Sequence, residues 1–238
     1  LARNAPIAFY TVRDGLASDD VSHLFEDARG DVWFGTFNPA RDPLTRWQRS
    51  TGRFERFGSR EGLPGLGSPF RFVGDRAGNV WISYRDGTLA RFRRGRFEVL
   101  SGRDGFPSAP VGGFALDALG RLWMTTFGQG LLRVEAPDAE RAVAVPVGAA
   151  QGIGAFHLGP IVGEEGGRIV FATSRDLLRF DPADGSISEL RAARGVLSSD
   201  ATAGCRDRSG IVWFASWNGL LRVDPRTRER VLAAAAEL

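Results

Sequence analysis

Short runs of alternating apolar and polar residues, separated by turns rich in Gly and Asp, recur along the 238-residue chain. Runs rich in β-branched and aromatic residues predict β-strands when turn residues bound them. One run occurs five times, and the copy at residues 168–171 has Val at the position of Trp. The copies are residues 31–34 (Asp-Val-Trp-Phe), 79–82 (Asn-Val-Trp-Ile), 121–124 (Arg-Leu-Trp-Met), 168–171 (Arg-Ile-Val-Phe) and 211–214 (Ile-Val-Trp-Phe). Their spacing of 42–48 residues indicates a repeated structural unit.

A turn motif, acid-x-x-Gly, precedes each of these runs at a fixed distance. The acids are Asp27, Asp75, Asp117, Glu164 and Asp207, and the glycines are Gly30, Gly78, Gly120, Gly167 and Gly210. A carboxylate that accepts backbone N–H bonds, followed by a glycine at positive φ, is typical of a tight turn. We therefore expect each motif to close a β-hairpin.

Two further strands complete the predicted unit. A Leu-x-Arg-apolar run follows each Trp position, and a short outer strand follows a second turn. A unit of four antiparallel strands over 42–48 residues is typical of a propeller blade. The sequence thus predicts an all-β propeller whose four-stranded blades stack on one another. The five predicted blades are residues 15–57, 62–100, 105–147, 152–190 and 195–232.

A linker phrase also recurs between the units, as Asp14-Gly15-Leu16, Glu61-Gly62-Leu63-Pro64 and Asp104-Gly105-Phe106-Pro107. Together with the Asp-x-x-Gly-x-Val-Trp and Leu-Leu-Arg-Val motifs, it resembles the two-component regulator propeller repeat, over residues 7 to about 232. The resemblance implies a seven-bladed or tandem propeller in the periplasmic sensor part of a histidine-kinase-type receptor. Val170, Ser83 and Thr125 depart from the family pattern.

The strand count predicts an incomplete array. Residues 7–11 have the spacing of an outer strand from a preceding blade, and residues 228–232 can supply the outer strand of the fifth blade. This gives one strand more than five complete blades, so we expect a segment of a longer propeller. A closed five-bladed disc is the alternative, if residues 7–11 pair onto the fifth blade.

Composition narrows the functional classes. All 31 cationic side chains are Arg, and they lie scattered among 28 acids, without the continuous basic stripe of a nucleic-acid-binding protein. No apolar stretch is long enough to cross a membrane, and no signal peptide is visible. The single cysteine, Cys205, excludes an internal disulfide; we expect it to be buried. We predict no cofactor and no metal site.

The repeated residues have structural interpretations. We expect the Trp residues to form the core between blades, with stacking on sugars as the alternative. The acids of the turns are interpreted as turn formers. The Arg of each Leu-x-Arg is expected to extend along the blade surface or to form an ion pair there.

Candidate ligand-binding residues lie where the repeat is broken. The loops after the Trp strands differ in every blade and combine aromatic, Arg and amide side chains on one face, as recognition of polyols or glycans requires. These candidates are Phe37, Asn38, Tyr84, Arg85, Phe127, Gln129, Arg175, Trp217 and Asn218. Ordinary solvated loops are the alternative interpretation.

A second candidate set lies seven residues before each turn acid. It consists of Asp20, Ser68, Pro110, His157 and Asp200, which should surround the mouth of the central channel. Two Asp and one His there could bind hydroxyl groups or a cation. His23 falls in the middle of a strand, so we expect it to have a packing role.

We therefore predict a non-enzymatic, ligand-sensing propeller segment of a bacterial two-component receptor. The expected partner is a small molecule or an oligosaccharide, with a homodimer formed through the parent receptor and no nucleic-acid or membrane contact within this segment. The resemblance implies carbohydrate ligands and a periplasmic location. A protein-interaction scaffold and a propeller lyase or hydrolase with His157 as base are the alternatives.

Overall fold

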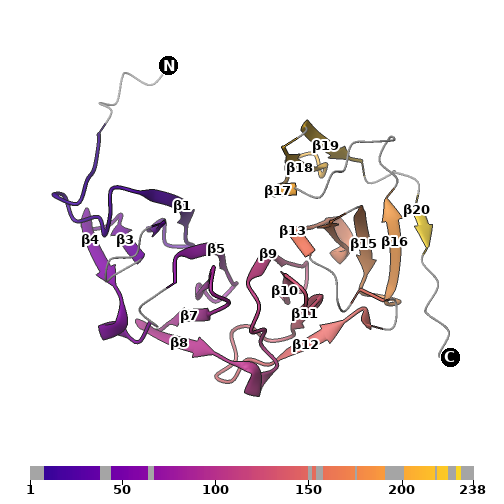
Figure 1. Cartoon of the computed structure of the whole chain (residues 1–238), viewed down its shortest axis with the longest axis horizontal. Helices are drawn as coiled ribbons and strands as arrows, with labels where there is room; N and C mark the ends of the chain where they lie inside the picture. The colour runs from indigo at the N-terminus through magenta and orange to yellow at the C-terminus, as the bar shows by residue number, and fades with distance from the viewer. Residues whose placement is uncertain are drawn as a thin grey trace.

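The protein is an all-β arc of antiparallel sheets in a computed structural model (Figure 1). The structure describes residues 8–37, 44–63, 67–149, 152–153, 158–174, 176–190, 201–217, 219–224 and 229–231. The helices among them are three short 3-10 turns, η1 (Ser59–Glu61), η2 (Gly102–Asp104) and η4 (Glu165–Gly167). None of the described helices has the length and apolar character needed to span a membrane.

Each sheet is a blade whose strands run outward from the hub in chain order. Blade 1 contains β1 (Val21–Glu26), β2 (Val32–Thr36), β3 (Leu44–Gln48) and β4 (Arg53–Phe57). Blade 2 contains β5 (Pro69–Gly74), β6 (Val80–Tyr84), β7 (Leu89–Arg93) and β8 (Arg96–Leu100). Blade 3 contains β9 (Val111–Leu116), β10 (Leu122–Thr126), β11 (Leu131–Val134) and β12 (Ala144–Val147). Figure 1 shows the inner strands β1, β5, β9, β13 and β17 along the concave side of the arc.

The last two blades differ from the predicted four-strand pattern. Blade 4 contains β13 (Leu158–Gly163), β14 (Ile169–Thr173), β15 (Leu177–Asp181), β16 (Ser186–Leu190) and β20 (Glu229–Val231). Blade 5 contains β17 (Ala201–Arg206), β18 (Val212–Ser216) and β19 (Gly219–Val223).

The prediction that residues 228–232 form the outer strand of blade 5 is therefore wrong. Residues 229–231 pair antiparallel with the outer strand of blade 4, with Ser188 opposite Val231. In blades 1, 2 and 4 the turn into the outer strand contains a glycine at positive φ: Gly52, Gly95 and Gly185. The segment after β19 has no glycine before Glu229. Without that residue a tight hairpin is disfavoured, and the open edge of β16 offers the backbone partners instead.

The expected outer strand at residues 7–11 is also not observed in the described part of the chain. Residues 8–11 have no strand assignment, and residue 7 lies outside the described ranges. Thr11 begins a turn in which its backbone N–H and hydroxyl both donate to the Asp14 carboxylate. The Tyr10 ring lies 5.3 Å from that of Phe54 on β4, so this segment packs on blade 1 and does not close the disc onto blade 5.

The interpretation of the Trp residues as core between blades is confirmed for three of them. Trp33, Trp81 and Trp123 are fully buried. The ring of Trp33 lies 5.0 Å from that of Phe92 in blade 2, and that of Trp123 lies 5.3 Å from Phe180 in blade 4. Trp213, in the last blade, is only partly buried because no described blade follows it.

Each Trp is also held within its own blade by the turn acid. The indole N–H donates to the carboxylate six residues earlier, at 2.9 Å for Trp33–Asp27, 3.0 Å for Trp81–Asp75, 2.9 Å for Trp123–Asp117 and 2.8 Å for Trp213–Asp207. Burial raises the pKa of Asp117, but the hydrogen bonds from Trp123 and Arg121 lower it by more. The pKa of Asp117 therefore lies below its ordinary value. In these four blades the Asp carboxylate also accepts backbone N–H bonds within its turn, so these acids are turn formers, as predicted, and also anchors for the indole.

The expectation for the Leu-x-Arg arginines is wrong in blades 2 and 4. Arg91 and Arg179 are 1% and 2% exposed, so they lie inside the protein and not along its surface. Arg91 stands opposite Trp81 in the strand register, with its guanidinium carbon 5.4 Å from the ring centre. It donates to the carbonyls of Pro137, Ala139 and Glu140 and to the Glu98 carboxylate. Complete hydrogen bonding of the guanidinium makes its burial tolerable.

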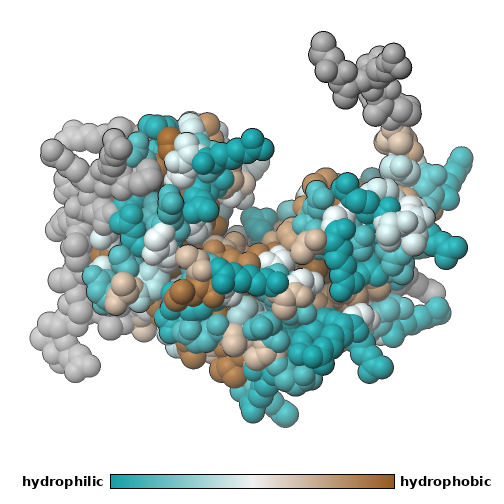
Figure 2. Space-filling view, turned by 180° about the vertical axis from the view of Figure 1, so that it is seen from behind, coloured by the Kyte–Doolittle hydropathy of each residue, from teal (hydrophilic) through white to brown (hydrophobic). Residues whose placement is uncertain are grey.

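The end blades leave apolar surface uncovered among the described residues. Leu24 on β1 is 72% exposed and Leu220 on β19 is 63% exposed. Cys205 on β17 is exposed, contrary to the expectation of a buried thiol, because no described blade covers that side of blade 5. Figure 2, which views the molecule from behind, shows hydrophobic surface near the notch between the two arms of the arc.

Candidate ligand site at the hub

A β-bulge occurs at the same place in the inner strand of every blade. The register of each inner strand against its neighbour shifts so that one extra residue is accommodated near the start of the strand. A bulge re-aims side chains that a regular pleat would turn elsewhere. We call the bulge residues the bulge ring; they are Ser22, Phe70, Gly112, Gly159 and Thr202. All five line one cavity at the hub.

A second ring lies directly above the first. The residue immediately after the second strand of each blade also lines this cavity. We call these residues the rim ring; they are Phe37, Arg85, Phe127, Ser174 and Trp217. In the first three blades the backbone N–H of the rim residue donates to the carbonyl of the residue before the inner strand, at 3.1, 3.1 and 3.0 Å to Asp20, Ser68 and Pro110. This repeated bond fixes where the rim side chains begin.

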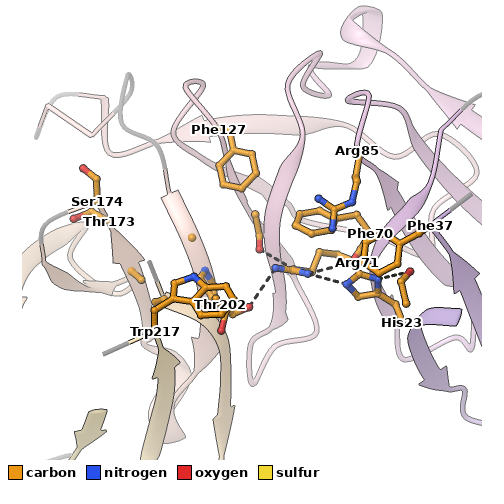
Figure 3. Close-up of a pocket in the computed structure, with 16 residues that line it drawn as sticks. His23, Phe37, Phe70, Arg71, Arg85, Phe127, Thr173, Ser174, Thr202 and Trp217 are labelled. Atoms are coloured by element: carbon orange, nitrogen blue, oxygen red, sulfur yellow. Dashed lines mark hydrogen bonds between the residues drawn. The ribbon is translucent and has the colours of Figure 1, made fainter. Parts of the chain in front are cut away.

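The two rings line a half-open cavity of about 670 Å³ on the concave side of the arc (Figure 3). Its lining combines aromatic rings, hydroxyl groups and small residues with two guanidinium groups, Arg71 and Arg85, and one imidazole, His23. No Asp or Glu belongs to the described lining. Nor do the described residues contain any cluster of three or more metal-ligating side chains. The described lining of the cavity is therefore electropositive and aromatic.

Arg71 reaches across the hub and joins several blades. Its Nε donates to the Gly112 carbonyl at 3.0 Å, and Nη2 donates to the Thr202 carbonyl at 3.3 Å. Its Nη1 donates to the Phe70 carbonyl at 3.1 Å and lies 3.4 Å from Nε2 of His23. Burial, followed by the nearby Arg85 charge, lowers the pKa of Arg71. The side chain is thus both a fixed element of the cavity floor and a source of positive charge.

Arg85 lies over aromatic rings. Its guanidinium carbon is 4.4 Å from the centre of the Phe70 ring and 5.4 Å from that of Phe37. Arginine stacked on an aromatic face keeps its N–H donors pointing outward in one plane. Figure 3 shows its guanidinium close to the Phe70 ring at the cavity. The stacking therefore orients the guanidinium group of Arg85 and leaves its N–H groups able to donate hydrogen bonds.

The neighbours of His23 favour its neutral form. Arginine can only donate, so Nε2 must accept from Arg71, and the proton is on Nδ1. Nδ1 lies 2.9 Å from Oγ of Ser22, whose hydroxyl donates to the Gly35 carbonyl at 3.1 Å. Burial, then the charges of Arg71 and Arg85, lower the pKa of His23. We expected His23 to have a packing role, and the sequence did not indicate that it also lines the cavity.

The structure brings together four of the predicted site residues and separates others from them. Phe37, Arg85, Phe127 and Trp217 all line the cavity. Tyr84 does not, since it is fully buried in the core between blades 1 and 2, where burial raises the pKa of its hydroxyl. As the last residue of β6 it points into the sheet packing, so its assignment as a ligand residue is corrected.

Three other candidates have local structural contacts. Gln129 accepts hydrogen bonds from the backbone N–H groups of Ser108 and Ala109, both at 2.9 Å, and so fixes a loop. Ser68 donates to the Phe37 carbonyl at 2.7 Å. Asp20 and Ser68 lie beside the cavity without lining it. Asn38, His157, Arg175, Asp200 and Asn218 lie outside the described residues.

Phe70, Arg71 and His23 line the cavity but were not among the residues predicted from the sequence. These residues occupy bulge positions, where residues of very different type stand in the five repeats. Ser22-His23, Phe70-Arg71, Gly112-Gly113, Gly159-Pro160 and Thr202-Ala203 are the corresponding pairs. This variation was available in the sequence, but the alternation of a regular strand would turn only one residue of each pair toward the hub.

The comparisons with known proteins agree with this architecture. Residues 15–38 match the family model described as two component regulator propeller. None of the curated proteins matches the chain in sequence. At 17% identity and a TM-score of 0.72, the chain is similar to the extracellular domain of a hybrid two component system, BT4673, from B. thetaiotaomicron, over 97% of this chain and 33% of that one.

Two similar structures are enzymes. The virginiamycin B lyase from Staphylococcus aureus is 16% identical with a TM-score of 0.66, over 92% of this chain and 70% of that one. A gluconolactonase from Xanthomonas campestris is 13% identical with a TM-score of 0.59, over 87% of this chain and 72% of that one. Identities this low show the fold alone.

The chain spans about a third of the length of the receptor domain that it resembles. The sequence motifs of the repeat recur along the chain, and the family model matches them in the first blade only. The chain thus carries a two component regulator propeller repeat at residues 15–38, within a β-propeller fold that it shares with the extracellular domain of a two-component system.

Proposed function

We propose that this chain is a non-enzymatic, ligand-sensing segment of a bacterial two-component receptor, located outside the cytoplasm, and that its ligand binds in the hub cavity. The observation that supports this most is the convergence of the two rings on one cavity of about 670 Å³. Cavities of this size suit a small molecule or a short oligosaccharide.

The contrast between repeated and variable positions supports the same proposal. The Asp–Trp pairs repeat because every blade must stack on its neighbour. The rim ring instead presents Phe, Arg, Phe, Ser and Trp from the successive blades. Aromatic faces combined with hydrogen-bonding groups are what recognition of a sugar ring requires. A cavity lined by residues of different type is consistent with selection of one ligand.

An enzymatic role is the second candidate, and His23 is the observation that favours it. The similar lyase is described as catalytically inactive when one of its histidines is replaced by alanine. A general base needs an available nitrogen lone pair. The Nε2 lone pair of His23 faces a guanidinium donor, and its Nδ1 proton points to Ser22. No described carboxylate in the cavity could act in its place. This geometry favours binding over catalysis.

Signalling requires that the ligand bind one state of the receptor more tightly than another. In this proposal the cavity collects side chains from all five blades, so a ligand bound there favours one spacing of the blades. The parent receptor would pass that change to the partner subunit of a homodimer. A protein-interaction scaffold would need no occupant in the cavity.

Thermal unfolding in the presence of a panel of neutral and acidic sugars tests the proposal. A ligand that binds only the folded protein raises its Tm by mass action. We expect at least one sugar to raise the Tm of the chain, and Trp217→Ala to reduce that rise. Leu220→Ala, at another exposed apolar residue of blade 5, is the matched control. Absence of any shift at millimolar concentrations would favour the scaffold, whereas turnover of a substrate that His23→Ala abolishes would favour the enzyme.

A further inference from the structure

We propose that the hub cavity binds an organic anion, namely a ring that carries a carboxylate, and that Arg85 receives this carboxylate above Arg71. This inference rests on the proposed function, since it names the class of ligand for the same cavity. The inference goes beyond the proposed function because a ligand-sensing propeller could equally bind a neutral molecule.

The balance of charge in the cavity is the first observation. The other buried or partly buried arginines of the described chain lie against acids, as in Arg46–Glu55, Arg91–Glu98 and Arg179–Glu164. In the cavity Arg71 and Arg85 lie close enough for the charge of one to affect the other. No described Asp or Glu lines the cavity to offset them. Two like charges held together without a counterion favour an incoming anion.

The hydrogen-bonding capacity of the two guanidinium groups is the second observation. Arg71 has five N–H donors, and four of them already have acceptors in Gly112, Phe70, His23 and Thr202. No hydrogen bond or ion pair joins the Arg85 guanidinium to another described side chain or carbonyl, and its contacts are the Phe37 and Phe70 rings. Arg85 therefore offers the fork of donors that a carboxylate accepts, while Arg71 supplies charge from below.

The aromatic part of the lining is the third observation. Phe127 and Trp217 both line the cavity, and Figure 3 shows Trp217, which is 80% exposed, across from the arginines. Exposed aromatic faces at a cavity stack on flat or ring-shaped apolar surfaces. A small inorganic anion would interact with the arginines and make no contact that needs the Trp217 ring. The combination favours an anion carried on a ring.

Two sources share this chemistry, a sugar acid and an aromatic acid. Calorimetric titration of the whole 238-residue chain with glucuronate, glucose, benzoate and inorganic phosphate separates them. Glucose is the neutral counterpart of glucuronate, and phosphate tests for an anion without a ring. We expect glucuronate or benzoate to bind, and whichever of them binds identifies the source. Glucose and phosphate should bind at least tenfold more weakly.

The variant Arg85→Gln tests the residue, with Arg208→Gln as its control. Arg208 is an exposed residue of the blade 5 turn, away from the cavity, and its replacement removes the same charge. We expect Arg85→Gln to weaken binding of the ring acid by about tenfold or more, the effect of losing one charge-assisted pair, and Arg208→Gln to leave it within twofold. Arg85 is exposed, so the fold should survive; a circular dichroism melt of each variant checks this.

The outcomes separate this inference from the proposed function. Binding of glucose as tightly as glucuronate, with no effect of Arg85→Gln, would overturn the anion and leave the sensing role in place. Equal loss in Arg85→Gln and Arg208→Gln would mean that only net charge matters and would also overturn the site. Binding of phosphate as tightly as of the ring acids would overturn the requirement for a ring. Binding of none of the four probes by the folded chain would count against both.

Discussion

The Glu164 carboxylate accepts a hydrogen bond from Nη2 of Arg179 at 2.7 Å, and both side chains are almost fully buried. Glu164 is the turn acid of blade 4, where Val170 stands in the place of Trp. In the other four blades an Asp at this position accepts from the indole N–H. Where the indole is missing, the longer carboxylate reaches the cross-strand Arg, so two departures from the repeat compensate each other.

Glu164→Ala should destabilise the protein by about 3 kcal/mol or more, because it removes the carboxylate that offsets a buried guanidinium. Urea unfolding of this variant measures the loss. In the double variant Glu164→Ala/Arg179→Leu the loss should be smaller than the sum of the two single losses. Additive losses would mean that the pair is not coupled. Glu26→Gln, at an exposed residue, serves as control.

Trp81→Phe should cost more stability than Trp213→Phe. Trp81 is fully buried between blades 2 and 3 and donates to Asp75, which is also buried. Loss of the indole leaves both a cavity and a less satisfied carboxylate, at about 2 to 4 kcal/mol. Trp213 makes the same bond but is only partly buried. Equal free energies of unfolding for the two variants would contradict the difference between an internal and an end blade.

Gly105→Ala should destabilise the protein by at least about 2 kcal/mol more than Gly95→Ala. Both glycines have positive φ, of 77° and 82°, so both variants carry the same backbone strain. A Cβ on Gly105 would lie 2.0 Å from the Ala144 carbonyl oxygen, whereas one on Gly95 meets nothing within 4 Å. Chemical denaturation of the two variants isolates this close approach of the blade linker. Similar midpoints would show that the linker can move.

The stability of the protein should fall as the pH decreases below about 6.5, in a way that depends on His23. Burial, then Arg71 and Arg85, lower the pKa of His23 in the folded protein, so below the ordinary His pKa the unfolded chain binds the extra proton. Stability then rises with pH across this window. The urea midpoint of His23→Gln should change less between pH 7.5 and 5.5 than that of the parent chain. An identical change in both proteins would exclude His23 as the cause.

Cys205 should react with a thiol reagent in the native protein. It is exposed on β17, and thiol access governs such reactions at a given pH. We expect one thiol per chain to react with Ellman's reagent without denaturant, and none in Cys205→Ser. A thiol that reacts only after urea is added would show that blade 5 is covered in solution.

The all-β class could be predicted from the amino-acid sequence, as could the repeat of 42–48 residues and the stacking role of Trp33, Trp81 and Trp123. These features follow from local turn chemistry and from a periodic apolar pattern, and both can be recognised in the sequence because they involve residues close together in the chain. The sequence also placed the loops after the second strands on one face, and the residues that begin four of them, Phe37, Arg85, Phe127 and Trp217, line the cavity.

The set of side chains that meet at the hub depends on how the chain folds in three dimensions. The bulges bring His23 and Arg71 into the cavity because one extra residue per inner strand breaks the alternation that a sequence pattern assumes. The pairing of β20 with β16 likewise depends on which sheet edge is open, and the burial of Arg91 depends on carbonyls 46 to 49 residues later in the chain. Contacts between residues so far apart have no local signature, so the chain must fold before they exist.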